Sequence, residues 1–155
     1  MNELPNFTPY GYRLLEVLSN NIEGKPIIYR AIQLSTNDYV FIKQANFTPS
    51  TSWEVNQRVE QKVRQEIKIL PSLKHSGIPN YLGTIDHPDG ICLVQDYIDA
   101  QNFSSSRIFD FEQIKSITTQ LLEILDYLQS SFPPIFHLNI TPETVLYDEQ
   151  NGRVY

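Results

Sequence analysis

The sequence has a single cysteine, Cys92, in 155 residues. Disulfides and multi-thiolate metal sites both need several cysteines, so neither can form within the chain. Cys92 lies in the apolar run 91–94, where a buried and inert thiol is the usual case. The first residues lack the basic and apolar regions of a signal peptide, and no apolar run approaches the ~20 residues that span a bilayer. We expect a cytoplasmic protein that does not enter a membrane.

Positive charge is also scarce. The chain has 12 Lys and Arg against 18 Asp and Glu, a formal charge of −6. Such a surface repels nucleic acid and anionic membranes unless a local basic patch overcomes the repulsion. The most basic stretch, residues 58–74, is interleaved with Glu60, Glu66 and glutamines, as on a solvated helix face. We expect neither nucleic acid nor membrane as a partner.

What the sequence does contain is the material of an ordinary folded domain, with 41% hydrophobic and 12% aromatic residues. Short β-capable runs separated by polar or proline-containing turns predict a five-stranded antiparallel sheet. The expected strands cover residues 12–18, 27–34, 39–43, 78–85 and 91–98.

A first helix is expected between the third and fourth strands. Thr51 and Glu54 fit a capping box, and an apolar stripe follows at helical spacing at Val55, Val59, Val63, Ile67 and Leu70. Glu66 lies three residues after Val63 and four before Leu70, so it is expected on the packed side. A carboxylate there needs a partner.

A polar linker is expected at residues 101–107, followed by a second helix over residues 110–131. Asp110 and Gln113 form its capping box, and Pro133-Pro134 closes it. Asn151-Gly152 between residues 144–147 and 153–155 predicts a hairpin. The fold class is α+β.

These elements carry motifs that resemble the eukaryotic-type (Hanks-type) Ser/Thr protein kinases, from their start to just past the catalytic loop. The similar segments are Val40-Phe41-Ile42-Lys43 (V-A-I-K), Arg64-Gln65-Glu66-Ile67 with Leu73-Lys74-His75-Ser76-Gly77-Ile78-Pro79, Leu93-Val94-Gln95-Asp96-Tyr97-Ile98, and the residues His137 to Leu146 (H-R-D-[LI]-K-P-E-N-[IV]-L). The resemblance implies a kinase N-lobe, with five strands and one helix, over residues 1–100. Residues 101–155 would form part of a helical C-lobe.

The resemblance also implies a nucleotide cleft. Lys43 and Glu66 match the ion pair that orients the phosphates, Gln95 stands at the gatekeeper position, and Asp96 and Ile98 belong to the hinge. A structural salt bridge that ties the helix to the sheet is the favoured interpretation of this pair, and we expect that removing either partner would leave the other charge desolvated at a cost of several kcal/mol. Weak ATP binding is therefore one hypothesis, and no cofactor is required. The loop at residues 19–26 keeps one glycine, Gly24, where the family has G-x-G-x-x-G, so phosphate binding by this loop is not expected.

The catalytic positions are degenerate. Asn139 stands where the family has the catalytic aspartate, and a neutral amide cannot accept the proton. Thr141 replaces the loop lysine, Thr144 replaces the Mg²⁺-binding asparagine, and Leu138 replaces the loop arginine. The 155 residues contain no D-F-G motif, so we expect no metal site and no phosphotransfer. His137 is expected to pack and hydrogen-bond within the loop.

Helix 110–131 has apolar residues on several faces. We expect that Ile117, Leu121, Ile124 and Leu128 cannot all be covered within the chain, which predicts self-association or a protein partner on this helix. Three functions follow: an inactive kinase-like interaction module in signalling, a nucleotide sensor without catalysis, or residual phosphotransfer by an unusual route. The chain is interpretable either as a natural short protein or as a fragment of a longer kinase homologue.

Overall fold

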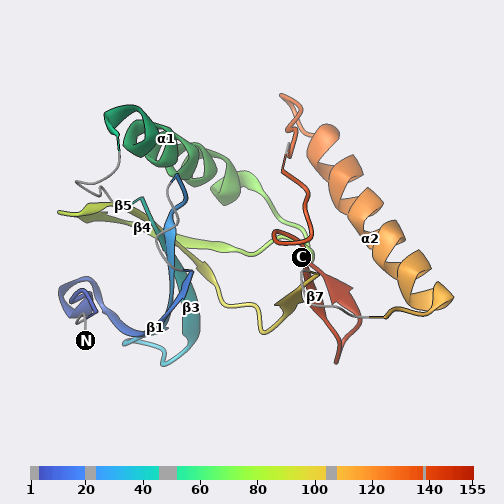
Figure 1. Cartoon of the computed structure of the whole chain (residues 1–155), viewed down its shortest axis with the longest axis horizontal. Coiled ribbons are helices and arrows are strands. Elements are labelled where there is room, and N and C mark those ends of the chain that lie inside the picture. The colour runs from blue at the N-terminus through green and yellow to red at the C-terminus, as the bar shows by residue number, and fades with distance from the viewer. Residues whose placement is uncertain (1–3, 20–23, 46–51, 104–107, 138) are drawn as a thin grey trace. The chain divides into compact units, whose positions relative to one another are not determined.

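The computed structural model describes residues 4–19, 24–45, 52–103, 108–137 and 139–155 (Figure 1). Its contacts divide the chain into two compact units. The first, here the sheet unit, comprises Met1–Leu73 and Asn80–Tyr97. The second, here the helix unit, comprises Lys74–Pro79 and Ile98–Tyr155. Each unit is described by itself.

The sheet unit is built on the predicted five-stranded antiparallel sheet. Its spatial order is β1-β2-β3-β5-β4, and every neighbouring pair is antiparallel. The strands are β1 (Tyr12–Ser19), β2 (Ile27–Gln33), β3 (Tyr39–Gln44), β4 (Tyr81–His87) and β5 (Gly90–Asp96). Two strands differ from their predicted ranges: β4 begins three residues later than the predicted 78–85, and β5 ends two residues earlier than the predicted 91–98. The sequence prediction of this sheet is therefore confirmed, with shifts only at its ends.

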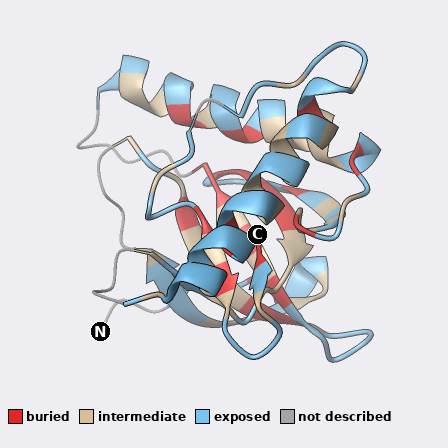
Figure 2. Ribbon diagram, turned by 90° about the vertical axis from the view of Figure 1, so that its right-hand side faces the viewer, coloured by how far each residue is buried: buried red, intermediate tan, exposed pale blue. Residues whose placement is uncertain are grey.

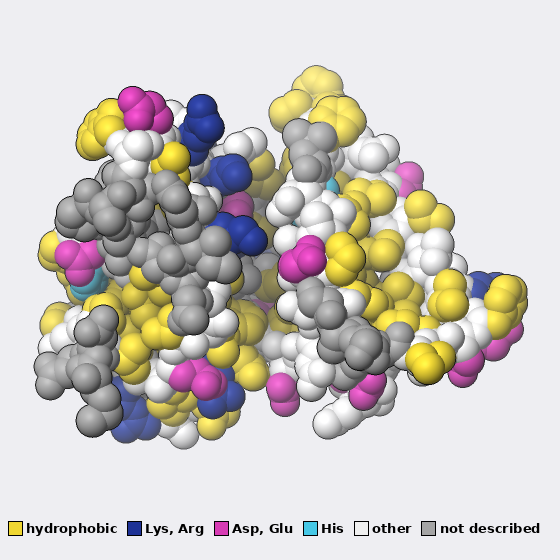
Figure 3. Space-filling view, in the orientation of Figure 1, with side chains coloured by type: hydrophobic (Ala, Val, Ile, Leu, Met, Phe, Trp, Pro, Cys, Tyr) yellow, Lys and Arg dark blue, Asp and Glu magenta, His cyan; other side chains and the backbone are white. Residues whose placement is uncertain are grey.

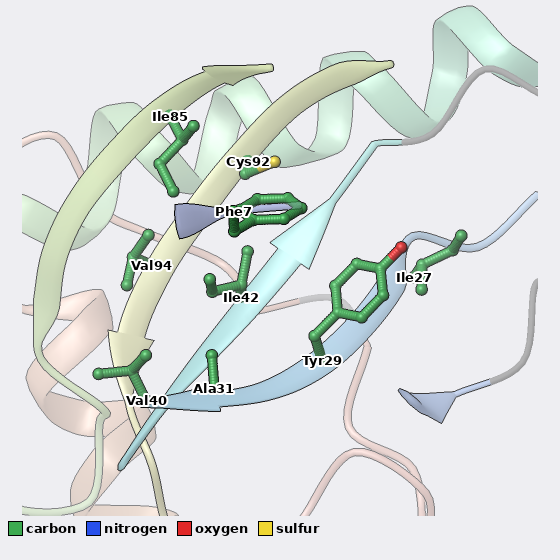
Figure 4. Packing of buried hydrophobic residues seen from close by; sticks show 9 residues of the cluster. All are labelled: Phe7, Ile27, Tyr29, Ala31, Val40, Ile42, Ile85, Cys92 and Val94. Carbon is green, nitrogen blue, oxygen red and sulfur yellow. The ribbon is translucent and has the colours of Figure 1, made fainter. Parts of the chain in front are cut away.

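One face of the sheet is covered by a cluster of buried apolar side chains (Figure 4). It contains Phe7, Ile27, Tyr29, Ala31, Val40, Ile42, Ile85, Cys92 and Val94, all buried. Side chains alternate along a strand, so this face takes every second residue of β2 and β3. Phe7 was not predicted from the sequence. It precedes the short 3₁₀ helix η1 (Thr8–Tyr10) and stacks on His87 with ring centroids 4.7 Å apart.

Helix α1 (Trp53–Ile69) covers the opposite face of the sheet. Its N-cap is Ser52, whose hydroxyl accepts a hydrogen bond from the amide of Val55. The predicted cap was one residue earlier, at Thr51, which lies outside the described residues. Val59 and Val63 are buried against β5 in a second cluster with Ala45, Ile91 and Leu93, as the apolar stripe predicts. The 3₁₀ helix η2 (Leu70–Ser72) follows α1.

The helix unit contains helix α2 (Phe111–Gln129) and a small three-stranded sheet. The capping box of Asp110 and Gln113 is present as predicted. Strand β7 (Leu146–Asp148) pairs with β8 (Arg153–Val154) across the predicted hairpin turn, where Gly152 takes a φ of 62° that favours glycine. β6 (Gln101–Asn102) pairs with β7 on its other side. The predicted linker is therefore wrong at its first two residues, whereas residues 104–107 lie outside the described residues.

The burial of α2 differs from the expectation. Ile117 and Leu128 are 8% and 3% exposed, and Leu121 and Ile124 are half-buried, so the unit covers the face that was expected to be bare. Ile117 packs with Tyr147 and Val154 of the small sheet and with Val145, which precedes β7.

The uncovered residues of α2 lie on the adjacent face. Phe111, Ile114 and Leu122 are 76%, 52% and 61% exposed. They recur at spacings of three and eight residues, which places them on one side of a helix. Figure 2 shows most of the visible surface of α2 as exposed, and Figure 3 shows hydrophobic side chains spread over this unit. We call Phe111, Ile114 and Leu122 the α2 apolar face.

Candidate functional site

The ion pair of the predicted nucleotide cleft is present in the sheet unit. Nζ of Lys43, on β3, lies 2.6 Å from Oε2 of Glu66, on α1. Because Val40 and Ile42 point into the apolar cluster, alternation places Lys43 on the face toward α1. The two side chains are 21% and 40% exposed, so the pair is not fully desolvated and a cost of several kcal/mol for its loss is too large.

The hinge residues follow from the end of β5. Gln95 is paired with Phe41 of β3 and with Tyr81 of β4. The carboxylate of Asp96 accepts hydrogen bonds from the side-chain and backbone N–H groups of Asn80, at 2.6 and 3.2 Å. The structure therefore brings Lys43, Glu66, Gln95 and Asp96 into one unit. Ile98 is half-buried and begins the helix unit.

Three residues outside the predicted nucleotide site, Glu16, Arg30 and Phe41, form a row with Gln95 across the same face of the sheet. The register pairs Glu16 with Arg30, Arg30 with Phe41, and Phe41 with Gln95. The ring of Tyr97 lies over this row, 4.8 Å from that of Phe41. The strand alternation was a usable signal, since Phe41 lies two residues before Lys43 and so shares its face.

The degenerate catalytic loop closes on itself through Thr144. Its hydroxyl oxygen lies 2.7 Å from the carbonyl oxygen of Asn139, to which it can donate, and accepts from the amide of Thr141 at 3.0 Å. The two threonine hydroxyl oxygens are 3.4 Å apart. The structure thus brings together Asn139, Thr141 and Thr144, three of the four positions at which the sequence differs from the kinase motif. The hydrogen-bonding groups that the loop presents there are neutral amides and hydroxyls.

The remaining loop predictions have mixed outcomes. His137 is exposed, and within the described residues it makes no hydrogen bond, so the expected packing role is wrong. Leu138 lies outside the described residues, as do residues 20–23 of the predicted phosphate loop. At the ends of that loop, the Ser19 hydroxyl accepts from the amide of Ile28, and Gly24 takes a φ of 79°.

The thiol of Cys92 in the sheet unit is buried and inert. Burial, followed by the charges of Asp86 and Asp89, raises the pKa of the Cys92 thiol to about 12, so it stays protonated at neutral pH. Among the described residues, no three His, Cys, Asp or Glu side chains gather as a metal site would require. None of the described helices has the length and apolar character to cross a membrane.

Comparison with known proteins agrees with this geometry. The family model of the protein kinase domain matches residues 24–154. In the solved structure of Rad53 residues 1–466 with AMP-PNP, 37% of that chain superposes on 93% of this one with a TM-score of 0.73 and 17% identity, which shows the kinase fold. The chain therefore belongs to the protein kinase family.

Its relatives include proteins described as inactive and others described as kinases. The chain is 28% identical over 146 residues to the probable inactive serine/threonine-protein kinase samkD of Dictyostelium discoideum. It is 29% identical over 125 residues to the MAP kinase kinase kinase SSK2 of Saccharomyces cerevisiae. The matches cover 91% and 78% of this chain, but only 25% and 8% of those relatives. The chain thus spans a quarter or less of their length.

Proposed function

We propose that this chain is a catalytically inactive protein kinase-like domain that acts by binding another protein in signalling. One observation carries the proposal: the amide of Asn139 stands at the position of the proton-accepting carboxylate. Kinase catalysis depends on positioning, metal-held charge and that acceptor, because the enzyme performs little covalent chemistry itself. The hydroxyl of Thr144, at the metal-binding position, is engaged with the loop backbone. The description of samkD as probably inactive supports the same reading.

Phosphotransfer from radiolabelled ATP and Mg²⁺ to a general protein substrate tests the catalytic part. We expect no transfer above background by the chain. Label transfer that disappears in Lys43→Ala would contradict the proposal, because that loss would assign the transfer to this cleft rather than to a contaminating kinase.

The binding part is supported by the α2 apolar face. Three large apolar side chains on one helix face, each more than half exposed, form a surface that association would remove from water. Burying apolar area contributes roughly 25 cal/mol per Å² before the costs of association. We propose that a protein surface covers this face, either that of a partner or that of a second copy of the chain.

Light scattering at micromolar concentration separates the two occupants. Self-association should appear as a dimer or larger species that Leu122→Glu returns to a monomer. The matched control is Leu82→Glu, the same change at a residue of β4 that is 43% exposed. A wild-type monomer contradicts self-association. A heteromeric partner recovered by cross-linking in cells should then be lost in Leu122→Glu and kept in Leu82→Glu.

Weak nucleotide binding is the second candidate function. The intact pair of Lys43 and Glu66 supports it, together with Gln95, Asp96 and Ile98 at the hinge positions. A thermal-shift titration with ATP, with and without Mg²⁺, tests it. A ligand at 100 times its Kd stabilises a protein by roughly 2.7 kcal/mol, which is readily measured. Absence of any shift at millimolar ATP contradicts this candidate.

A further inference from the structure

The face of the sheet that carries Lys43 also carries a large aromatic residue between Lys43 and the hinge. In the register of β3 and β5, Lys43 is opposite Leu93 and Phe41 is opposite Gln95. A nucleotide with its phosphates at Lys43 and its base at Asp96 would have to lie along this face at Phe41. The resembled motif, V-A-I-K, has alanine at that position, so Phe41 adds a six-membered ring there.

The ring of Phe41 is already covered by another part of the chain. Tyr97 lies against it at 4.8 Å between centroids and 49° between planes. Tyr39, next along the face of β3, also contacts Tyr97, with ring centroids 5.8 Å apart. Tilted pairs at this distance are favourable packing arrangements for aromatic rings. The phenyl ring of Phe41 is therefore engaged by Tyr97 and does not offer an open platform on which a base could stack.

A cation holds the aromatic residues in place. The guanidinium of Arg30 lies 5.6 Å from the ring centre of Tyr39 and 5.8 Å from that of Tyr97, within cation–π range. Its Nε is 2.8 Å from Oε1 of Glu16. A hydrogen bond with Tyr97, and to a smaller extent the charge of Glu16, raises the pKa of Arg30, which keeps it cationic. Three strands and the hinge thus contribute to one cluster.

We propose that Phe41 and Tyr97 occupy the place of the nucleotide base, so that the sheet unit does not accept adenine in this orientation. Two groups cannot share the same packed volume, so a base could enter only once the Phe41 ring is removed and Tyr97, which rests against it at 4.8 Å between ring centroids, can move aside. Phe41 is then the residue that decides nucleotide specificity here. In this arrangement the pair of Lys43 and Glu66 ties α1 to the sheet and has no phosphate to orient, which opposes the second candidate function.

Binding of ATP and of adenosine to the whole chain, measured by isothermal titration calorimetry, tests the proposal. We expect no saturable binding of either ligand by the wild type. Phe41→Ala should bind both ligands saturably, with affinities at least tenfold above the weakest that the calorimeter detects. The matched control is Phe136→Ala, which removes the same ring from a residue of the helix unit that is 64% exposed and lies outside the α2 apolar face. In the Phe41→Ala background, Lys43→Ala should weaken ATP binding and leave adenosine binding unchanged.

Two results would overturn the proposal. One is wild-type binding of adenosine as tight as that of Phe41→Ala. The other is a folded Phe41→Ala that binds no more than Phe136→Ala. Should Phe41→Ala fail to fold, Phe41→Val keeps a β-branched residue in the strand while removing the ring. The proposal does not rest on the α2 apolar face, whose test reads the oligomeric state of variants in the other unit.

Discussion

The sheet unit buries its large apolar residues more completely than the helix unit does. In the sheet unit, apolar clusters fill both faces of the sheet, and Ile42 and Val94 are fully buried. In the helix unit the buried cluster is small, whereas Phe111 is 76% exposed and Phe132 fully exposed. A sheet that carries a helix on one face and an N-terminal aromatic residue on the other can complete its own core. A helix packed on three short strands has a second apolar side that those strands do not cover.

The two units also differ in how closely their residues match the kinase motifs. The sheet unit has the ion pair of Lys43 and Glu66, while Asn139, Thr141 and Thr144 in the helix unit differ from the kinase motif. A salt bridge that joins a helix to a sheet has a structural use, so it can persist without catalysis. A catalytic carboxylate in an exposed loop has no such second use.

The largest expected effect tests whether the core difference is energetic. Ile42→Ala should lower the free energy of unfolding by about 2–5 kcal/mol, because the side chain is fully buried. Ile114→Ala, the same change on the α2 apolar face, should stay within about 0.5 kcal/mol. Urea unfolding followed by circular dichroism compares the two. Equal losses would contradict the burial difference between the units.

Two glycine substitutions test the packing within each unit, because the helix unit is tightly packed at Gly77. A Cβ on Gly77 would lie 2.5 Å from Cδ1 of Ile124 and 3.0 Å from the carbonyl oxygen of Val154. Gly77→Ala should therefore destabilise by about 1–3 kcal/mol in urea unfolding. Gly83→Ala in β4, where a Cβ meets nothing within 4 Å, is the matched control and should be neutral. A harmless Gly77→Ala would show that this packing is loose.

Alkaline pH should weaken the sheet unit through its buried acids. Burial raises the pKa of Tyr29 and of Cys92 to about 12, from ordinary values of 10.0 and 9.0. Since the folded pKa values exceed the unfolded ones, this stability is fully present below pH 9 and is lost as the pH rises toward 12. Each group contributes a loss of about 1.4 kcal/mol per pH unit between its two pKa values. Urea unfolding at pH 8 and 11 measures the slope, and Cys92→Ala should reduce it.

The smallest expected effect concerns the ion pair of Lys43 and Glu66. A double-mutant cycle with Lys43→Ala and Glu66→Ala should give a coupling of about 0.5–1 kcal/mol, because Glu66 is 40% exposed and solvent screens the pair. The i,i+4 pair of Glu60 and Arg64 on α1, whose side chains are 25% and 53% exposed, serves as the reference, with about 0.3–0.5 kcal/mol expected. A coupling of several kcal/mol would show that the pair is desolvated in solution.

Much of the architecture was predictable because it depends on local patterns. β-Capable runs bounded by turns predicted β2 and β3, helical spacing predicted α1, and the capping box of Asp110 and Gln113 predicted the start of α2. The errors lie where local signals are weak or ambiguous. Ser52 rather than Thr51 caps α1, since adjacent hydroxyl residues are equally good caps by composition. A two-residue strand such as β6 has no pattern of its own and forms only because β7 lies beside it.

The order of the helices and strands followed from the sequence, because the periodicity of apolar residues is a local property. The presence of an amide at position 139 also followed from the sequence, because it depends only on which residue stands there. The tertiary structure decided which side of α2 stays exposed, that Phe7 enters the sheet core, and that Tyr97 covers Phe41. Those outcomes depend on residues distant along the chain meeting in space. Only the packing of the whole unit selects among the contacts that the sequence allows.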